Sequence, residues 1–500
     1  MHSALLLDDV LRQIFDFCPT NCLPAAARSC KAWSDPAFDG IWCHIGSVIP
    51  LLNLIPGLVC VDGVYDLDSE VPLDLTIFNS YASRIKHITQ RHNTRVHPSL
   101  LSILSKPGNA ILNKLASTRL SSIDLHCIPA ALSLSPSLRQ LDLDLGFRNR
   151  RSSDGSSDYI EQLLSVATSL ERVRLRGTAS HRLNIGIAQM SNLRSLSLRT
   201  GTFLTGDTLV AISTFPRLSE LDIEAGHLDV GGLTTAWSAP APDAGYFQSL
   251  QKLHVCGQAP LLELLLRTIH PASLRTLRIE ATASSSETAV YWNSICDLIK
   301  DNASQTLEDL TIEQHLDDLD LDTIHDASDT TAPHPSTQTN RITFDIIRTF
   351  APLRRLRKLT IDMTRIPSLS DQDIEALATW WPDLTHLDLG SLHSSECIPS
   401  AGTPRATLAC LRAFASSMPM LQTLILPLSI ADVPPPSSSP STSSSALSSA
   451  TFSSSGPPSD PAAMSLYLHG LFPQLTGVEG TAQHEAAWGE VQALLRDLAH

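Results

Sequence analysis

The residues most able to do chemistry are thiol and imidazole side chains near the start of the sequence. Cys18, Cys22, Cys30 and His44 are all ligand types that zinc accepts. Cys18 and Cys22 are close in sequence, but the remaining spacing is looser than in known zinc motifs. We therefore expect small, buried side chains of a helical segment here rather than a metal site.

The sequence contains no motif of a known catalytic class. It has no Gly-rich phosphate loop, no Gly-x-Ser-x-Gly elbow and no His-Glu-x-x-His element. Its 18 His are dispersed, and its 10 Cys lack the paired spacing of a disulfide framework. We therefore expect a protein that is not an enzyme and needs no cofactor. The alternative is a hydrolase whose active site is built on a repeat protein, but no motif in the sequence supports it.

Composition narrows the classes of partner. A net charge of -15 over 500 residues disfavours nucleic acid, which needs a clustered positive field. Residues 1–7 are apolar but run directly into Asp8 and Asp9, so no signal peptide is expected. The uncharged stretch Ile41 to Val61 is interrupted by Pro50 and Pro56, which favours a broken core segment over a membrane span. We expect a cytoplasmic or nuclear protein with no membrane partner.

A short leucine-led unit recurs along the chain and predicts repeated strands. Each unit has a leading Leu, a polar residue, and then aliphatic residues at alternating positions. In four of the units, and in a further one led by Leu475, a Pro stands two places before the leading residue, where it stops a preceding helix. The leading residues are Leu120, Leu138, Leu170, Leu193, Leu218, Leu250, Leu274, Leu307, Leu356, Leu384 and Leu421.

Helix-like runs alternate with these units, for example Leu261 to Ile269 and Val290 to Asp301, where apolar residues recur every three or four positions. A repeated strand and helix resembles the leucine-rich repeat family. The fold class expected is therefore α/β, an irregular leucine-rich repeat solenoid with a parallel sheet on its concave face and helices outside.

Alternation along each strand predicts which residues line the concave face. The aliphatic residues point inward, so the polar residues between them point out. The candidate target-binding residues are Arg172, Arg174, Arg176, Arg199, Glu220, Asp222, Glu224, Lys252, His254 and Arg278. The Arg172 and Glu220 rows are expected about 10 Å apart, two strands along the sheet. The alternative is that these side chains are only the solvated side of a sheet.

The first 45 residues resemble an F-box. The matching elements are Leu6-Leu7-Asp8-Asp9-Val10-Leu11, Ile14-Phe15, Cys30-Lys31-Ala32-Trp33 and Ile41-Trp42. Leu7 stands where the family usually has Pro, and Pro24 replaces a residue that is commonly acidic or small and polar. The resemblance implies a three-helix module that binds a Skp-type adaptor and, through it, a cullin. The implied adaptor-binding residues are Leu6, Leu7, Val10, Leu11, Ile14, Phe15, Trp33 and Trp42.

These observations predict an order of segments and a function. We expect an F-box-like module at 1–45, a connecting helical or first-repeat region at 46–118, and repeats at 119–430 with an acidic and polar insert near 317–340. A disordered Ser/Pro-rich insert at 431–463 and a terminal repeat with a capping helix at 464–500 would follow. The resemblance implies a substrate receptor of a Skp-cullin-F-box ubiquitin ligase that holds an unknown protein target. A repeat scaffold unrelated to ubiquitin, with the first helices acting only as a cap, is the alternative.

Overall fold

The structure is a computed structural model with two compact units, Met1–Leu218 (unit 1) and Ser219–His500 (unit 2). It describes residues 7–68, 70–91, 94–104, 112–121, 134–146, 161–163, 165–178, 181–238, 245–271, 273–282, 288–315, 343–363, 367–390, 404–430, 432–435, 445–453, 456–480 and 484–499. Leu6 and the predicted insert at 317–340 lie outside these residues.

Unit 1 begins with three helices that share a small core. They are α1 (Asp8–Asp16), α2 (Leu23–Ser29) and α3 (Lys31–Cys43). Their core is formed by Leu11, Phe15, Leu23, Ala27 and Ala37. The predicted three-helix module is therefore present. Helix α2 ends at Ser29, and Trp33 belongs to α3.

A connecting region follows, with a small sheet beside the first strands of the repeats. It contains β1 (His44–Ile45), α4 (Ile49–Leu52), β2 (Leu58–Val61), β3 (Val64–Leu67), α5 (Thr76–Ala82), β4 (His87–Gln90), β5 (Arg95–Val96) and α6 (Pro98–Leu104). Strands β2 and β3 form an antiparallel hairpin, and its two turn residues, Asp62 and Gly63, have φ of 53° and 77°. Two positive φ values are what a tight hairpin turn requires. The uncharged stretch is thus divided between short elements, and none of the described helices has the length and apolar character needed to cross a bilayer.

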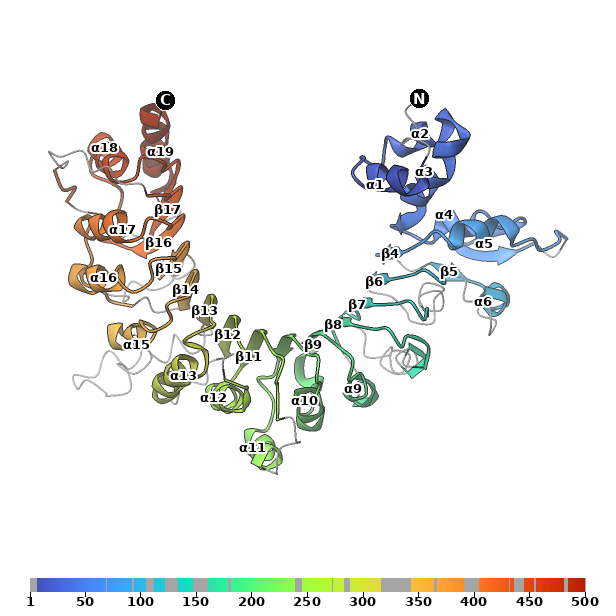
Figure 1. The fold of residues 1–500 in the computed structure, drawn as a ribbon, viewed down its shortest axis with the longest axis horizontal. Coiled ribbons are helices and arrows are strands. Elements are labelled where there is room, and N and C mark those ends of the chain that lie inside the picture. Colours follow the sequence, from blue (N-terminus) through green and yellow to red (C-terminus); the bar gives the residue numbers. More distant parts are fainter. Residues whose placement is uncertain are drawn as a thin grey trace. The chain divides into compact units, whose positions relative to one another are not determined.

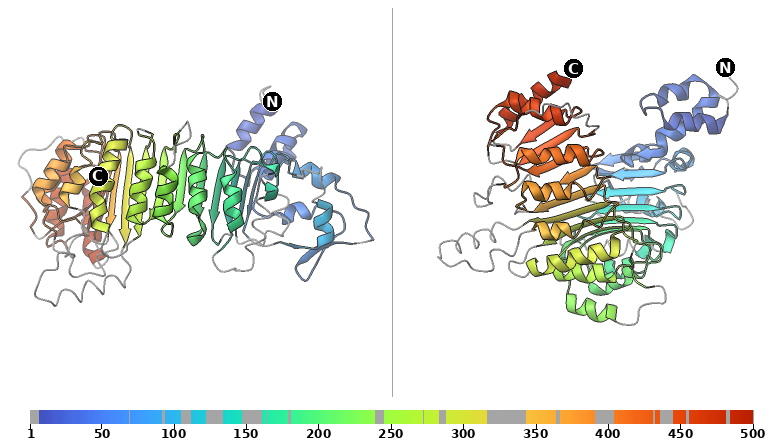
Figure 2. Two further views of the ribbon diagram at one scale, coloured as in Figure 1. Left: turned by 90° about the horizontal axis from the view of Figure 1, so that it is seen from below. Right: turned by 60° about the vertical axis from the view of Figure 1, so that its left-hand side comes forward.

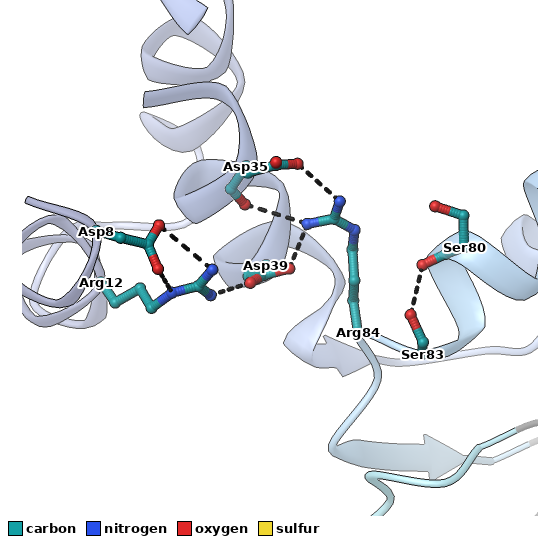
Figure 3. Close-up of polar contacts among 7 residues, drawn as sticks. All are labelled: Asp8, Arg12, Asp35, Asp39, Ser80, Ser83 and Arg84. Atoms are coloured by element: carbon teal, nitrogen blue, oxygen red, sulfur yellow. Dashed lines mark hydrogen bonds and ion pairs between the residues drawn. The ribbon is translucent and has the colours of Figure 1, made fainter. Parts of the chain in front are cut away.

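Ion pairs tie the three helices to the connecting region, as Figure 3 shows. Arg12 of α1 lies 2.7 Å from Asp8 and also contacts Asp39 of α3. The same Asp39 contacts Arg84, which lies 2.8 Å from Asp35. Asp39 therefore joins two arginines that lie far apart in the sequence.

The remainder of unit 1 is a parallel sheet with one strand per repeat. Its strand order is β1-β4-β6-β7-β8-β9, and Figure 1 shows α9 and α10 on one side of the sheet. The strands and helices are β6 (Ser117–Ser121), β7 (Gln140–Asp144), β8 (Arg172–Arg176), α9 (His181–Ala188), β9 (Ser195–Arg199), η2 (Gly201–Phe203) and α10 (Gly206–Ser213).

Unit 2 repeats the same arrangement, with strand order β10-β11-β12-β13-β14-β15-β16-β17-β18, all pairs parallel. Figure 2 shows its helices along one face of the strands. Its strands are β10 (Glu220–Glu224), β11 (Lys252–Gly257), β12 (Thr276–Thr282), β13 (Asp309–His315), β14 (Lys358–Met363), β15 (His386–Asp388), β16 (Thr423–Pro427), β17 (Ser449–Ser453) and β18 (Gly477–Gly480). Its helices are α11 (Val230–Ser238), α12 (Ala259–Thr268), α13 (Thr288–Ala303), α15 (Phe344–Arg348), α16 (Asp371–Leu377), η6 (Leu408–Cys410), α17 (Leu411–Ser417), α18 (Pro461–Leu471) and α19 (Glu485–Ala499).

The predicted repeat fold is confirmed, and with it most of the register. From Leu138 to Leu421, each leading leucine lies two residues before a strand, as Leu170 does before β8. Val173 and Leu175 of β8 point inward and are only 2% and 0% exposed. Burying such side chains contributes about 1.5–3 kcal/mol each, which is why this pattern determines the register.

The register predicted for the first repeat was wrong. Leu120 lies inside β6 and is buried, and the leading position belongs to Leu115. Arg119, between the buried Thr118 and Leu120, therefore faces outward. The chance pattern starting at Leu120 has the right residue types, but the strand is placed by its pairing with β4 and β7.

The prediction of disorder across 431–463 was also wrong in part. Residues 449–453 form β17, which pairs with β16 and β18, and residues 461–463 begin α18. Leu447, Ala450 and Phe452 are buried there, so two apolar side chains and one small one suffice once neighbouring strands flank the segment. At the end of the chain, α19 buries Trp488 against Phe452, with ring centroids 5.7 Å apart, and covers the last repeat.

Candidate functional site

The structure divides the predicted adaptor-binding residues into buried and exposed groups. Leu11 and Phe15 are 1% and 6% exposed and belong to the core of the module. Trp33 packs edge-on against Phe15, with centroids 5.9 Å apart. Trp42 lies 4.8 Å from the ring of Tyr81. Leu11 and Phe15 thus belong to the core of the module, Trp33 packs on that core, and Trp42 packs on α5 of the connecting region; both tryptophans are half-buried.

Among the described residues of the module, three large apolar side chains remain in solvent. Leu7 is 57% exposed, Ile14 is 40% exposed and Phe17 is 91% exposed. We call these three residues the α1 stripe. Leu7 and Phe17 are the N-cap and C-cap of α1, and at 100° per residue positions 7, 14 and 17 fall within about 80° of one another around the helix axis. Val10 lies between them and is half-buried.

The α1 stripe continues the buried side of the same helix. Leu11 and Phe15 occupy the adjoining part of the helix surface. The apolar arc of α1 is therefore wider than the part of it that is buried in the core of the module. Sequence reasoning missed Phe17, the most exposed of these residues. The signal that could have found it is its position three residues after Ile14, where it extends the stripe beyond the Ile14-Phe15 pair. An exposed apolar arc of this kind is typical of a partner surface.

The second surface is the face of each sheet opposite the helices, which we call the open face. In β8, Arg172, Arg174 and Arg176 are exposed, and Val173 and Leu175 between them are buried. The predicted alternation therefore holds in this strand. The same alternation places the other predicted residues, Arg199, Glu220, Asp222, Glu224, Lys252, His254 and Arg278, on the open face of their own unit.

The open face of unit 1 is basic. Strands β6 to β9 place five arginines and two aspartates there: Arg119, Arg172, Arg174, Arg176, Arg199, Asp142 and Asp144. Asp142 lies 3.0 Å from Arg119. The Asp144 carboxylate accepts a hydrogen bond of 3.0 Å from the Gly146 backbone N–H. Both acids thus have partners other than the arginines of β8.

The open face of unit 2 carries ion pairs between neighbouring strands. Lys252 of β11 donates to Glu220 of β10 at 2.8 Å. His254 lies between two carboxylates, with Nδ1 3.2 Å from Asp222 and Nε2 3.4 Å from Glu280. Each imidazole nitrogen therefore faces an acid. These pairs align side chains across β10, β11 and β12.

The same pairing continues toward the later strands. Arg278 of β12 donates to Glu313 of β13 at 2.8 Å. The side chain of Glu313 is only 14% exposed, whereas that of Arg278 is 47% exposed. The pair is therefore half in solvent, and Arg278 remains accessible to a partner.

Burial perturbs the acids and the histidine on β13 and β15. It raises the pKa of Asp388 to about 6, and the charge of Asp362 adds to the rise. A hydrogen bond of 3.1 Å from the Gly390 N–H opposes that rise. Burial also raises the pKa of Asp309 and lowers the pKa of His386. The cause in each case is that a partly dehydrated group disfavours its charged form.

The spacing predicted between the Arg172 and Glu220 rows stays a prediction. Arg172 lies on β8 of unit 1 and Glu220 lies on β10 of unit 2. Within unit 1 the arginines of β8 instead lie beside Asp142 and Asp144 of β7 and the serines of β9.

The thiols and imidazoles near the start do not gather into a metal site. Among the described residues, no three His, Cys, Asp or Glu side chains come together in a way that could hold a metal ion. Cys22 is exposed, and Cys18 and Cys30 are half-buried. Farther along the chain, burial raises the pKa of the Cys296 and Cys410 thiols, which keeps both in the neutral form.

Comparisons with known proteins add little to these surfaces. The sequence matches no protein-family model and no curated protein. Among solved structures, a chain from the crystal structure of the yeast Rad7 and Elc1 complex is 13% identical, with a TM-score of 0.38. The match covers 80% of this chain and 91% of that one. A likeness at this level carries no argument about function, which must come from the two surfaces described above.

Proposed function

We propose that this protein is a non-catalytic substrate receptor of a Skp-cullin-F-box type ubiquitin ligase. In this proposal the three-helix module binds a Skp-type adaptor, which links it to a cullin. The open face of the repeats holds a protein target, and other subunits transfer ubiquitin to it. The observation that carries the proposal is the α1 stripe, next to a module core that is already complete.

The geometry of α1 supports docking over simple capping. A helix that served only as a cap would bury its apolar arc against the repeats. Here Leu11 and Phe15 are buried, but Leu7, Ile14 and Phe17 remain in solvent. The module is instead held to the rest of unit 1 at another side, through the ion pairs of Arg84 with Asp35 and Asp39. Its apolar stripe is thus left for a partner.

The test is co-purification with a Skp-type adaptor. The variant Ile14→Asp with Phe17→Asp places two charges on the α1 stripe without touching the core. It is expected to lose the adaptor, because a buried, unpaired carboxylate at an interface is strongly unfavourable. Phe15 is unsuitable for this test, because it is 6% exposed and its replacement would unfold the module.

The matched control is Leu466→Asp in α18, a leucine that is 54% exposed and lies in unit 2. It is expected to bind the adaptor like the unmodified protein. Unchanged adaptor binding by the α1 variant, with its helical content intact, would contradict the proposal. A chain that binds no adaptor and affects no protein's lifetime would instead favour the repeat scaffold unrelated to ubiquitin.

A further inference from the structure

The arginines of β8 repeat at the spacing of an extended chain. Arg172, Arg174 and Arg176, which we call the arginine row, are all exposed on the open face of unit 1. Alternate residues of a strand lie about 6.6 Å apart. A second extended chain lying along β8 has the same repeat, so its alternate side chains would fall opposite successive arginines.

Two members of the arginine row have unused hydrogen-bonding capacity. Among the described residues, Arg172 and Arg174 make no ion pair or hydrogen bond with another side chain. Asp142 is in register with Arg174, but its carboxylate is 3.0 Å from Arg119. A guanidinium offers five N–H donors in a plane that suits a carboxylate. These two side chains are therefore ready to bind an anion.

The strand beside the arginine row leaves room for a ligand. In the register of β8 and β9, Arg172 pairs with Ser195 and Arg174 pairs with Ser197. Both are short side chains, so nothing on β9 at these two positions reaches above the guanidinium groups. A ligand lying along β8 would have the short Ser195 and Ser197 side chains on one side, of which Ser197 is only 8% exposed, and two arginines below.

We propose that the arginine row binds an extended, acidic segment of a partner protein, with carboxylates at alternating positions opposite Arg172 and Arg174. This inference deepens the target-binding half of the proposed function and does not depend on adaptor binding. It specifies an extended backbone, because a helical segment would separate alternate acids by about 200° around its axis.

The face is poorly suited to single-stranded nucleic acid. Such ligands are held by aromatic side chains on which bases stack. The strands β6 to β9 contain no Phe, Tyr or Trp.

The experiment measures binding of fluorescent peptides to the full chain by anisotropy. One peptide carries aspartate at three alternating positions in a Ser/Gly background, and a second has the same composition with its three aspartates adjacent. The alternating peptide is expected to bind more tightly and to weaken as salt rises. Equal affinity for the two peptides would overturn the inference, because it would reduce the effect to general charge attraction.

The variant Arg172→Gln with Arg174→Gln is expected to weaken binding of the alternating peptide by about tenfold, from the loss of two charge-assisted contacts. Arg172→Lys with Arg174→Lys should lose less, because the charge remains. The matched control, Arg182→Gln with Arg217→Gln, removes the same charge from α9 and from the turn before β10. An equal loss in that control would contradict the inference, as would a single-stranded oligonucleotide that competes better than the peptide.

Adaptor binding separates this inference from the proposed function. The Arg172→Gln, Arg174→Gln variant should still co-purify with a Skp-type adaptor, because the substitutions are on the repeats and not on the α1 stripe. If the unmodified chain binds the adaptor but binds the two peptides with equal affinity, the inference fails and adaptor docking stands. If it binds the alternating peptide but no adaptor, the inference stands and the ligase role fails.

Discussion

The perturbed carboxyl group of Asp388 leads to a prediction about stability and pH. Asp388 lies on β15, in register with Thr360 of β14 and Ile425 of β16, and accepts a hydrogen bond of 3.1 Å from the Gly390 N–H. Burial is the largest cause of its raised pKa, and the charge of Asp362 adds to it, while Lys358 and the Gly390 hydrogen bond oppose it. The folded protein therefore holds this proton more tightly than the unfolded chain does.

The sign and size follow from the difference between the two states. The pKa rises from 3.8 to about 6 on folding. Asp388 thus contributes stability below about pH 4, and this contribution is lost as the pH rises through about 6. At 1.36 kcal/mol per pKa unit the full effect is about 3 kcal/mol. Because Asp388 is only partly buried, we expect about 1–2 kcal/mol of it to be measurable.

The substitution Asp388→Asn removes the charge and keeps an oxygen that can accept from Gly390. We expect this variant to stabilise unit 2 by about 1–2 kcal/mol near pH 7.5 and by almost nothing near pH 4. The measurement is urea denaturation of the full chain at both pH values, with the transition of unit 2 followed separately. Asp383→Asn, on an exposed aspartate just before β15, is the control and should change little at either pH.

A gain that is the same at both pH values would refute this reasoning, because it would show that the charge is not the cause. A loss of stability near pH 7.5 would refute it as well. That result would mean that the carboxylate of Asp388 makes contacts whose value exceeds the free energy needed to dehydrate it.

Three further predictions concern the fold. Leu359→Ala, at a side chain that is 0% exposed, should leave a cavity and destabilise unit 2 by about 2–5 kcal/mol in urea denaturation, whereas Leu359→Met should cost less than about 1.5 kcal/mol. Equal losses would show that a cavity is not the cause. Asp39→Asn should lower the free energy of unfolding of unit 1 by about 1 kcal/mol in low salt and less in high salt, and a salt-independent loss would argue against ion pairing. Gly177→Ala should lower the free energy of unfolding by about 2 kcal/mol or more, since φ is +104° and the added Cβ would lie 2.6 Å from the Gly146 backbone N. Gly489→Ala in α19, where the added Cβ has open space, should be neutral or stabilising; thermal denaturation measures both variants.

The repeat fold was predictable because its signal is local and periodic. Leu170, Val173 and Leu175 give the register of β8 from three positions within six residues, and the same holds for the later repeats. Alternation then places Arg172 and Arg174 on the open face without any knowledge of neighbouring strands. A pattern repeated along the chain needs no long-range information to be recognised.

The errors share one cause, which is that composition says little about contacts between distant segments. Residues 449–453 look disordered because they are rich in Ser, yet β16 and β18 provide hydrogen bonds on both sides and a core for Phe452. Leu120 fits the leading position by residue type, but pairing with β7 assigns that place to Leu115. Likewise, the sequence does not distinguish the buried apolar residues of α1 from the exposed ones. The distinction arises because α2 and α3 pack over Leu11 and Phe15.

The sequence by itself determined the repeated strand and helix, the inward leucines and the polar residues that alternate with them, because these depend on spacing along one strand. Only the tertiary structure decided which half of the α1 arc stays exposed, that Arg172 and Arg174 pair with no other side chain among the described residues, and why the pKa of Asp388 is raised. Those properties depend on what other segments bring next to a side chain. Burial and charge around a residue are set by neighbours distant in sequence, and no local pattern records them.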